Sequence, residues 1–189
     1  MLRFFIINLF FLLSVTELHS QTEFESLSDS ANKWFISASV GAQMSGIKDE
    51  DFVSSNYSPL INITFGRRIS PLLAFHIGIK GFYFNYIADE SKHNYSFVYL
   101  GSSINLINLA VNSRNNKDWN LLIHTSLGIF NNILLNKLQG CINIGIQNNY
   151  SISESIEVSL DIASIIGWKI YQGDEDILPG VSFGIIYTF

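Results

Sequence analysis

The sequence predicts an all-β protein, an eight-stranded antiparallel up-and-down β-barrel that spans a membrane. Charged residues make up only 14% of the chain, where soluble proteins carry about 25%, and the mean hydropathy is positive. Beyond its N-terminal segment the chain has no apolar run approaching the roughly 18 residues that mark a spanning helix. From Trp34 onward, apolar residues instead recur at every second position. Because only helices and closed barrels can span a bilayer, these observations leave the barrel.

The N-terminus has the pattern of a secretory signal peptide. Arg3 precedes an apolar run over residues 4–15, which is too short for a spanning helix, and a polar stretch then ends at Ser20. Cleavage there would make Gln21 the first residue of the mature protein; the alternative is a buried N-terminal helix. The expected parts are a signal peptide over residues 1–20, a periplasmic lead-in over 21–33 and an outer-membrane barrel over 34–189.

Eight segments show the two-faced alternation of half-buried strands. In the first, Trp34, Ile36 and Val40 share one face while Ser37 and Gln43 share the other. The fourth segment is the least regular. The predicted strands cover residues 34–45, 61–66, 73–83, 95–111, 119–129, 141–147, 156–163 and 180–189.

The links between these segments alternate in character, as expected when successive links lie at opposite ends of a barrel. An even number of strands places both termini on the periplasmic side, with short turns there and longer loops outside. The expected external loops are residues 48–56, 85–94, 131–140 and 172–177, and the expected periplasmic turns are 67–72, 112–118 and 150–155.

Aromatic residues gather near the strand ends, which fits the two aromatic girdles of a membrane barrel. The expected periplasmic girdle contains Trp34, Phe65, Trp119, Tyr150, Tyr187 and Phe189, and the expected outer girdle contains Tyr83, Tyr86, Tyr95, Phe97, Phe130, Trp168 and Tyr171.

The main structural alternative is a soluble lipocalin-like barrel, with its apolar face inside and its polar face in water. The outer face of such a barrel would be rich in Lys and Glu. Here the polar face holds Ser, Gly, Asn, Gln and Thr, and its regular mid-strand charges are Lys80, Glu157 and Asp161. These residues favour a narrow polar lumen. A small sandwich with a weakly charged surface would show the same alternation and remains a further alternative.

An eight-stranded barrel is just wide enough for side chains to fill it, so we expect a closed lumen, with Phe82 among the residues that fill it. A charge in this interior must be paired. We expect a structural ion-pair network there rather than a gate or a proton path. The candidate lumenal residues are His76, Lys80, His124, Glu157 and Asp161.

Four weak motifs resemble one known family. They are the signal ending at Ser20, the turn at residues 66–71 that leads into a strand, the segment at 99–101 and the terminal strand that closes on Phe189. With these, residues 34–189 resemble the small outer-membrane β-barrels of Bacteroidetes-type bacteria, a PorT-like group that is more distantly similar to OmpA-type and OmpX-type barrels. The resemblance implies a fold and a location. Members differ in function, so no functional residue is carried over.

A second reading is enzymatic. The spacing of His124 and Ser126 resembles that of outer-membrane lipid A deacylases, and residues two apart on a strand share a face. Both side chains belong to the lumenal face, however, whereas that family acts on a lipid outside the barrel. The two neighbouring strands also supply no carboxylate to orient the imidazole. We therefore expect two lumen-lining polar residues and no enzyme.

Few other residues of the sequence point to a partner, a cofactor or a metal site. The net charge of −5 argues against nucleic acid as a partner, and the single cysteine, Cys141, excludes a disulfide scaffold. The histidines show no spacing for zinc or iron, so no metal or other cofactor is expected. Acidic groups at residues 49–51, 89–90 and 174–176 fall in expected external loops, where solvated loops are favoured over Ca²⁺ or Mg²⁺ sites.

The last strand alternates up to an aromatic C-terminus, with Tyr187 and Phe189 on its apolar face, and resembles the signal read by the outer-membrane assembly machinery. The sequence thus predicts a non-enzymatic, monomeric outer-membrane protein with a structural role in the envelope or a binding role carried by its loops. Its expected partners are outer-membrane lipid, lipopolysaccharide and the assembly machinery. A soluble periplasmic binder of a small apolar ligand is the third alternative.

Overall fold

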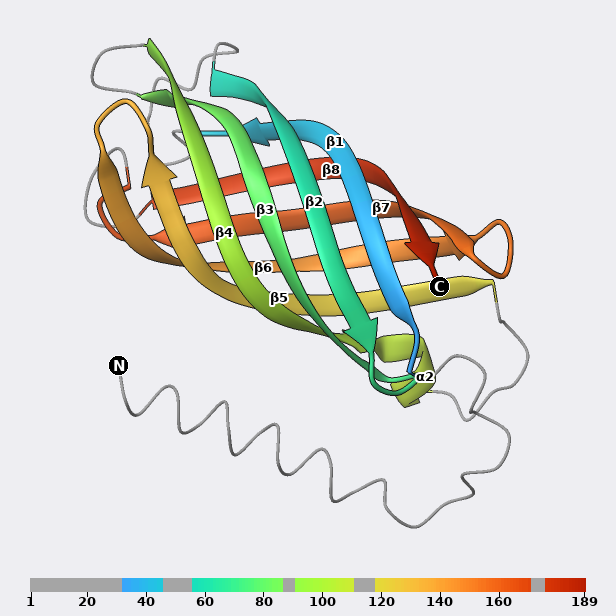
Figure 1. Cartoon of the computed structure of the whole chain (residues 1–189). Coiled ribbons are helices and arrows are strands. Elements are labelled where there is room, and N and C mark those ends of the chain that lie inside the picture. Colours follow the sequence, from blue (N-terminus) through green and yellow to red (C-terminus); the bar gives the residue numbers. More distant parts are fainter. Residues whose placement is uncertain (1–31, 46–55, 87–90, 111–117, 171–175) are drawn as a thin grey trace, which may run out of the picture.

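The computed structural model describes residues 32–45, 56–86, 91–110, 118–170 and 176–189. Within these ranges eight antiparallel strands form one closed barrel, in which each strand pairs with the next along the chain and the last pairs with the first (Figure 1). The predicted up-and-down topology is confirmed. The strands are β1 (Trp34–Met44), β2 (Tyr57–Arg68), β3 (Leu73–Tyr86), β4 (Ser91–Asn105), β5 (Trp119–Asn132), β6 (Lys137–Ser151), β7 (Ile156–Gly167) and β8 (Asp176–Thr188).

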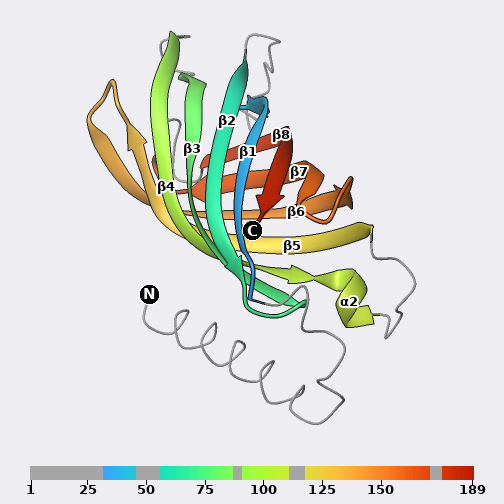
Figure 2. The same ribbon diagram turned by 45° about the vertical axis from the view of Figure 1, so that its right-hand side comes forward.

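The barrel closes between β8 and β1. Their ladder runs from the pair Phe35 and Thr188 to the pair Gln43 and Gly180. Past it, the amide of Trp34 donates to the carbonyl of Phe189 at 3.0 Å, and the amide of Phe189 donates back at 2.9 Å. The start of β1 and the end of the chain therefore lie together at one rim of the barrel, as Figure 2 shows. We call this the terminal rim and the opposite end the distal rim.

The barrel has a polar interior and an apolar exterior. Along β8, Val181, Phe183 and Ile185 are exposed, whereas Ser182 and Thr188 are buried. The middle parts of the other strands follow the same rule. This is the pattern of a transmembrane barrel and the reverse of a soluble lipocalin-like one.

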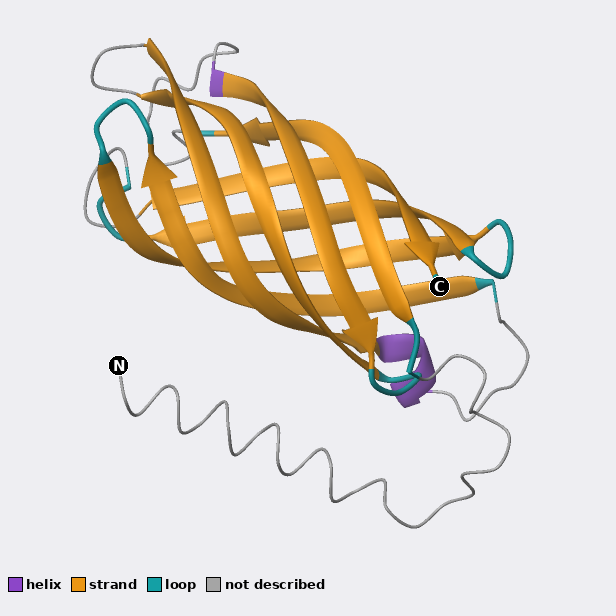
Figure 3. Cartoon of the chain, viewed as in Figure 1, coloured by secondary structure: helices purple, strands orange, loops and turns teal. Residues whose placement is uncertain are grey.

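The fourth predicted strand was wrong at both ends, because β4 begins at Ser91 and leaves the sheet at Asn105. The side-chain Oδ1 of Asn105 accepts the amides of Ile107 at 3.0 Å and Asn108 at 3.3 Å. These bonds satisfy the first free amides of a short helix, α2 (Leu106–Ala110), which lies at the terminal rim (Figure 3). The spacing of apolar residues along the sequence does not reveal such a helix cap. No helix in the described ranges is long and apolar enough to cross a membrane.

The predicted length difference between the two sets of links was also wrong in places. The link expected over residues 131–140 is a tight turn, because β5 continues to Asn132 and β6 begins at Lys137. The link from β4 to β5, expected to be short, contains α2. The strands extend into polar segments because backbone hydrogen bonding between strands does not require apolar side chains. The amino-acid composition therefore marks where the apolar band of the wall ends, and not where the strand pairing ends.

Candidate functional site

The lumen is the part of the molecule where polar groups gather, and it has two different halves. The half near the terminal rim is mainly polar, with a small apolar cluster of Phe35, Ala74 and Ile186. The distal half contains the aromatic and apolar cluster, together with buried polar residues closer to the rim such as Ser45, Asn56 and Asn85. The five predicted lumenal residues, His76, Lys80, His124, Glu157 and Asp161, are all buried.

Glu157 pairs with Arg68 near the terminal rim. A guanidinium nitrogen of Arg68 donates to Oε1 of Glu157 at 2.6 Å, and Nδ2 of Asn149 donates to Oε2 at 3.1 Å. The guanidinium also lies 5.8 Å from the ring centre of Phe35. The sequence analysis assigned Arg68 to a turn, but it is the last residue of β2 and its side chain reaches the buried carboxylate.

Asp161 pairs with His124. The Nε2 atom of His124 on β5 lies 2.8 Å from Oδ1 of Asp161 on β7, with β6 between them. Gly145 of β6 makes this contact possible, because a Cβ atom there would lie 2.6 Å from Nε2 of His124. A side chain at this position would occupy the space through which the imidazole reaches.

Two other glycines allow a contact of the same kind in the lumen. Gly101 lies between His76 and Ser126, whose Nε2 and Oγ atoms are 3.4 Å apart. Gly78 likewise lies between Tyr99 and Thr64, whose hydroxyl oxygens are 2.9 Å apart. In each case an inward-facing glycine lets the strands on either side of it share a hydrogen bond across the lumenal surface.

Lys80 is the most deeply buried of the predicted lumenal charges, at 4% exposed. Its Nζ atom donates to Oδ1 of Asn143 at 3.2 Å. In the described part of the chain, no carboxylate lies within salt-bridge distance of Lys80. The expectation of one ion-pair network was therefore wrong in its connectivity: Glu157 binds Arg68, Asp161 binds His124, and Lys80 binds an amide.

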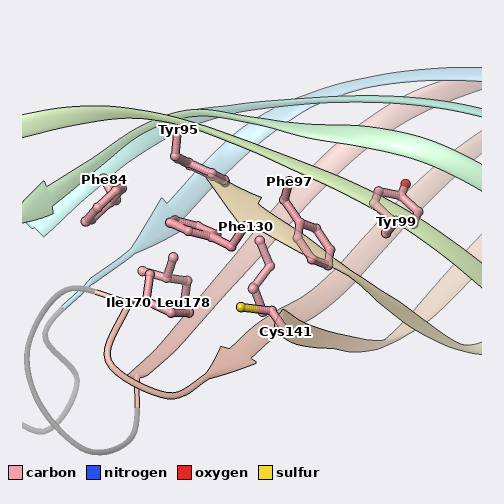
Figure 4. Packing of buried hydrophobic residues seen from close by; sticks show 9 residues of the cluster. Phe84, Tyr95, Phe97, Tyr99, Phe130, Cys141, Ile170 and Leu178 are labelled. Atoms are coloured by element: carbon pink, nitrogen blue, oxygen red, sulfur yellow. The ribbon is translucent and has the colours of Figure 1, made fainter. Parts of the chain in front are cut away.

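Aromatic rings fill the distal half of the lumen (Figure 4). The side chains of Phe84, Phe97 and Phe130 are completely buried. Tyr95 stacks on Phe130 with ring centres 4.7 Å apart, and its hydroxyl donates to Oε1 of Gln43 at 2.5 Å. The expected position of Tyr95, Phe97 and Phe130 in the outer girdle was therefore wrong. Their alternation places them inward, where they pack in the distal part of the lumen.

Phe82 was expected inside the barrel and lies outside, 44% exposed. Its φ of 152° departs from regular strand geometry and interrupts the alternation of β3. Tyr95, the residue opposite Phe82 in the ladder, points inward and occupies the space there. The two aromatic residues of this pair therefore lie on opposite faces of the wall.

The deacylase-like arrangement takes a different form from the expected one. Both His124 and Ser126 are buried in the lumen, and Ser126 lies near His76 rather than near His124. Asp161 orients His124 from two strands away, although neither neighbouring strand has a carboxylate. Serine, histidine and carboxylate are thus present, but on the opposite side of the wall from the apolar exterior.

Metal-binding chemistry is not assembled in the described ranges: no three His, Cys, Asp or Glu side chains there lie where they could hold an ion. Cys141 is a free thiol buried in the distal cluster. Of the predicted acidic loop residues, Asp176 was wrongly placed, because it is buried and accepts the amide of Ile170. Residues 49–51, 89–90 and 174–175 lie outside the described residues.

The exterior of the terminal rim has a band of paired aromatic rings. Trp34 stacks on Phe65 at 5.1 Å, and the guanidinium of Arg67 lies 5.1 Å from the Trp34 ring centre. The rings of Trp119 and Tyr150 are 6.3 Å apart, and those of Tyr187 and Phe189 are 5.9 Å apart. All six aromatic residues expected in this girdle are exposed. At the distal rim, Trp168 is exposed, Tyr83 is partly exposed, and Tyr171 lies outside the described residues.

Known structures share this architecture. The N-terminal β-barrel domain of Pseudomonas aeruginosa OprF matches with a TM-score of 0.56 and 12% identity, over 84% of this chain and 98% of that one. Neisserial surface protein A matches with a TM-score of 0.56 and 11% identity, over 87% and 100% of the two chains. Ail, the attachment invasion locus protein of Yersinia pestis, matches with a TM-score of 0.52 and 10% identity, over 84% and 99%.

This chain has the fold of the small outer-membrane β-barrels. No family model and no curated protein sequence matches it. At these identities the likeness concerns the fold alone.

The sequence analysis did not assign Arg68 and Asn149 to the lumen, and it placed Asn143 on the polar face without predicting its bond to Lys80. The two asparagines share a parity with the polar face of β6, so the alternation contained the signal. Arg68 lies at a strand end, where alternation is hard to read. Gly78 and Gly101 alternate with apolar residues and so belong to the polar face, but their role depends on the register between strands.

Proposed function

We propose that this chain is a non-enzymatic, monomeric integral protein of the outer membrane of a Bacteroidetes-type bacterium, with a structural role in the envelope or a binding role carried by its distal loops. The apolar exterior of the closed barrel carries the proposal. In the middle of the wall, Leu100, Leu127 and Ile144 are exposed side chains. In water such a surface would aggregate, whereas in a bilayer it is the stable arrangement.

A cleaved signal peptide and the assembly machinery are part of this proposal. The mature chain would begin at Gln21 and reach the membrane through the periplasm. Intact-mass measurement of the protein purified from membranes tests this directly. A mass that includes residues 1–20 would contradict export by a cleaved signal.

The decisive experiment places a charge on the exterior. Leu100, which pairs with Leu127 and Ile77, lies mid-wall, and its replacement by Arg should destabilise a lipid-embedded barrel by about 2–4 kcal/mol. Ile152 is equally exposed but lies in the turn after β6 at the terminal rim, so Ile152→Arg is the matched control. Folding is read from heat-modifiable gel mobility, and location from membrane fractionation.

We expect the wild type and Ile152→Arg in the outer-membrane fraction with heat-modifiable mobility, and Leu100→Arg depleted from it. A soluble barrel would tolerate both substitutions, because both would add a charge to a water-facing surface. Recovery of all three proteins as folded, soluble monomers would overturn the proposal.

The enzymatic alternative rests on the arrangement of Ser126, His76, His124 and Asp161 in the lumen. Ser126→Ala removes the hydroxyl that lies beside His76 and could serve as nucleophile in this arrangement. We expect cells carrying this variant to have the same lipid A mass spectrum as wild-type cells. A spectrum that changes with Ser126→Ala, as it does on deletion of the gene, would establish the enzyme instead.

A further inference from the structure

The turn between β5 and β6 has an unusual surface for the end of a barrel. Ile133, Leu134 and Leu135 of this turn are exposed, and so is Leu138 at the start of β6. Leu134 is the most exposed large apolar side chain among them, at 67%. The turn lies at the distal rim (Figures 1 and 3). We call these four residues the apolar tip.

The apolar tip is continuous with the apolar exterior of the same two strands. Leu127 pairs with Ile142 in the middle of the wall, and both are exposed. Ile129 and Leu138 extend this surface toward the turn. The distal end of the neighbouring strand β4 differs, because its exposed residues there are Lys92 and Asn94. The apolar surface therefore extends farther toward the distal end at β5 and β6 than at β4.

The backbone of the turn is suited to an apolar environment. The amide of Leu135 donates to Oδ1 of Asn132 at 3.2 Å, and the amide of Ile133 donates to the carbonyl of Asn94 at 3.0 Å. The amide of Asn136, whose φ is 48°, reaches the carbonyl of Ile133 at 3.4 Å. These bonds lower the cost of immersing the turn, since unsatisfied amides in hydrocarbon cost several kcal/mol each.

Two lysines and a tryptophan stand beside the apolar tip. Lys137 directly follows the turn, and its Nζ atom donates to the carbonyl of Lys169, which brings the two residues together. Trp168 precedes Lys169 and is 58% exposed. In the described part of the chain neither lysine has a carboxylate partner, and Asp176 is turned into the interior. An exposed Trp and paired cations next to apolar side chains are typical of the boundary between acyl chains and anionic headgroups.

We propose that the apolar tip together with Lys137, Trp168 and Lys169 binds a phosphate-bearing acylated lipid of the outer leaflet. Its acyl chains lie against the tip, and its phosphates lie beside the two ammonium groups. The inference rests on the proposed outer-membrane location. It commits to a lipid because the tip continues the lipid-facing exterior and because the described polar residues beside it, Lys137 and Lys169, are cations.

The test uses the mature chain in phosphatidylcholine nanodiscs that contain either diphosphoryl lipid A or the same lipid A without its phosphates. Native mass spectrometry counts the lipid A molecules retained by the released protein. The double substitution Lys137→Gln and Lys169→Gln should weaken retention of the diphosphoryl form by about 25-fold, since each cation near an anionic surface contributes roughly fivefold. The form without phosphates should be retained weakly by both proteins.

Lys92→Gln is the matched control, because Lys92 also lies at the distal rim but its side chain reaches away from the apolar tip to the carbonyl of Tyr57 on β2. It should retain lipid A like the wild type. A loss for Lys92→Gln equal to that of the double variant, or no loss for the double variant, would overturn the inference.

A separate experiment measures how deeply the apolar tip lies in the bilayer. Of the three tryptophans, Trp34 and Trp119 lie at the terminal rim, so their replacement by Phe leaves Trp168 as the reporter. Brominated acyl chains should quench Trp168, and Ile133→Asn with Leu134→Asn should reduce that quenching severalfold. Equal quenching with and without these substitutions would contradict the proposal, as would a dimer that the tip substitutions dissociate.

Failure of this inference can be told apart from failure of the proposed function. The mobility of the wild type before and after heating reports the membrane barrel independently of lipid A. A heat-modifiable wild type without preference for the phosphorylated lipid overturns the lipid site alone. A wild type that does not enter nanodiscs overturns both.

Discussion

The imidazole of His124 lies 2.8 Å from the carboxylate of Asp161, although a complete strand separates the strands that carry them. The contact depends on Gly145 in that middle strand, where any Cβ would meet the imidazole. Inward-facing glycines thus decide which polar groups can meet in this narrow lumen.

Gly145→Ala should destabilise the barrel by about 1–3 kcal/mol, as overpacking of a filled interior does. Its Cβ would lie 2.5 Å from Cβ of Ala163 and 2.7 Å from the carbonyl oxygen of Ile162. Gly140→Ala on the same strand is the control, because nothing lies within 4 Å of its Cβ position. Urea titration of folded protein in lipid measures both. Equal stability of the two variants would contradict the role of Gly145.

The Arg68 and Glu157 pair should respond asymmetrically to substitution. Arg68→Gln leaves a buried carboxylate without its cation and should cost about 3 kcal/mol. Glu157→Gln leaves an arginine whose side chain is 24% exposed and can reach water, so it should cost about 1 kcal/mol. The double variant should be more stable than Arg68→Gln alone. The same urea titration decides this, and the reverse order would show that Arg68 does not compensate the carboxylate.

The purified protein should form no steady channels in planar bilayers, because aromatic rings fill its distal half. Replacing both Phe97 and Phe130 by Ala should admit ions and cost several kcal/mol of stability. Phe183→Ala, which removes an exposed ring from the outer wall, should stay non-conducting. Porin-like channels from the wild type would refute a filled lumen.

Deleting residues 185–189 should abolish accumulation in the outer membrane, because it removes much of the ladder that closes β8 against β1. Phe189→Ser keeps this ladder and should lower accumulation severalfold if the terminal aromatic is part of an assembly signal. Phe65→Ser, which removes another exposed ring of the terminal rim, should have little effect. Quantitative blotting of membrane fractions measures the three variants. Accumulation of Phe189→Ser at the wild-type level would remove the signal from the proposal.

The fold class was accessible from the sequence because alternation is a local property of the backbone. Successive side chains of a strand point to opposite faces, so Val181, Phe183 and Ile185 had to share one face whatever their neighbours were. The small polar residues on the opposite face then predicted that this face lines the inside of a barrel. The aromatic residues of the terminal rim were predicted from their position near the strand ends, which can also be read locally from the sequence.

The occupants of the lumen could be predicted only in part. The sequence assigned Glu157, Asp161 and His124 to the inner face, but it did not predict that Asp161 pairs with His124 or that Glu157 pairs with Arg68. Those partners come from strands that are not adjacent to β7. Which residues meet across a barrel depends on the stagger between strands and on gaps such as that at Gly145, and neither is written in the pattern of a single segment.

The sequence by itself thus determined the strand number, the direction of the two faces and the placement of the start of β1 and the end of β8 at the same rim, since these follow from period two and an even count of strands. The tertiary structure alone decided that Tyr95, Phe97 and Phe130 fill the distal lumen, that Phe82 turns outward, and that Asn105 ends β4 in a helix. These outcomes depend on volume and on hydrogen bonds between residues that the register brings together. Register is a property of the closed barrel rather than of any one strand.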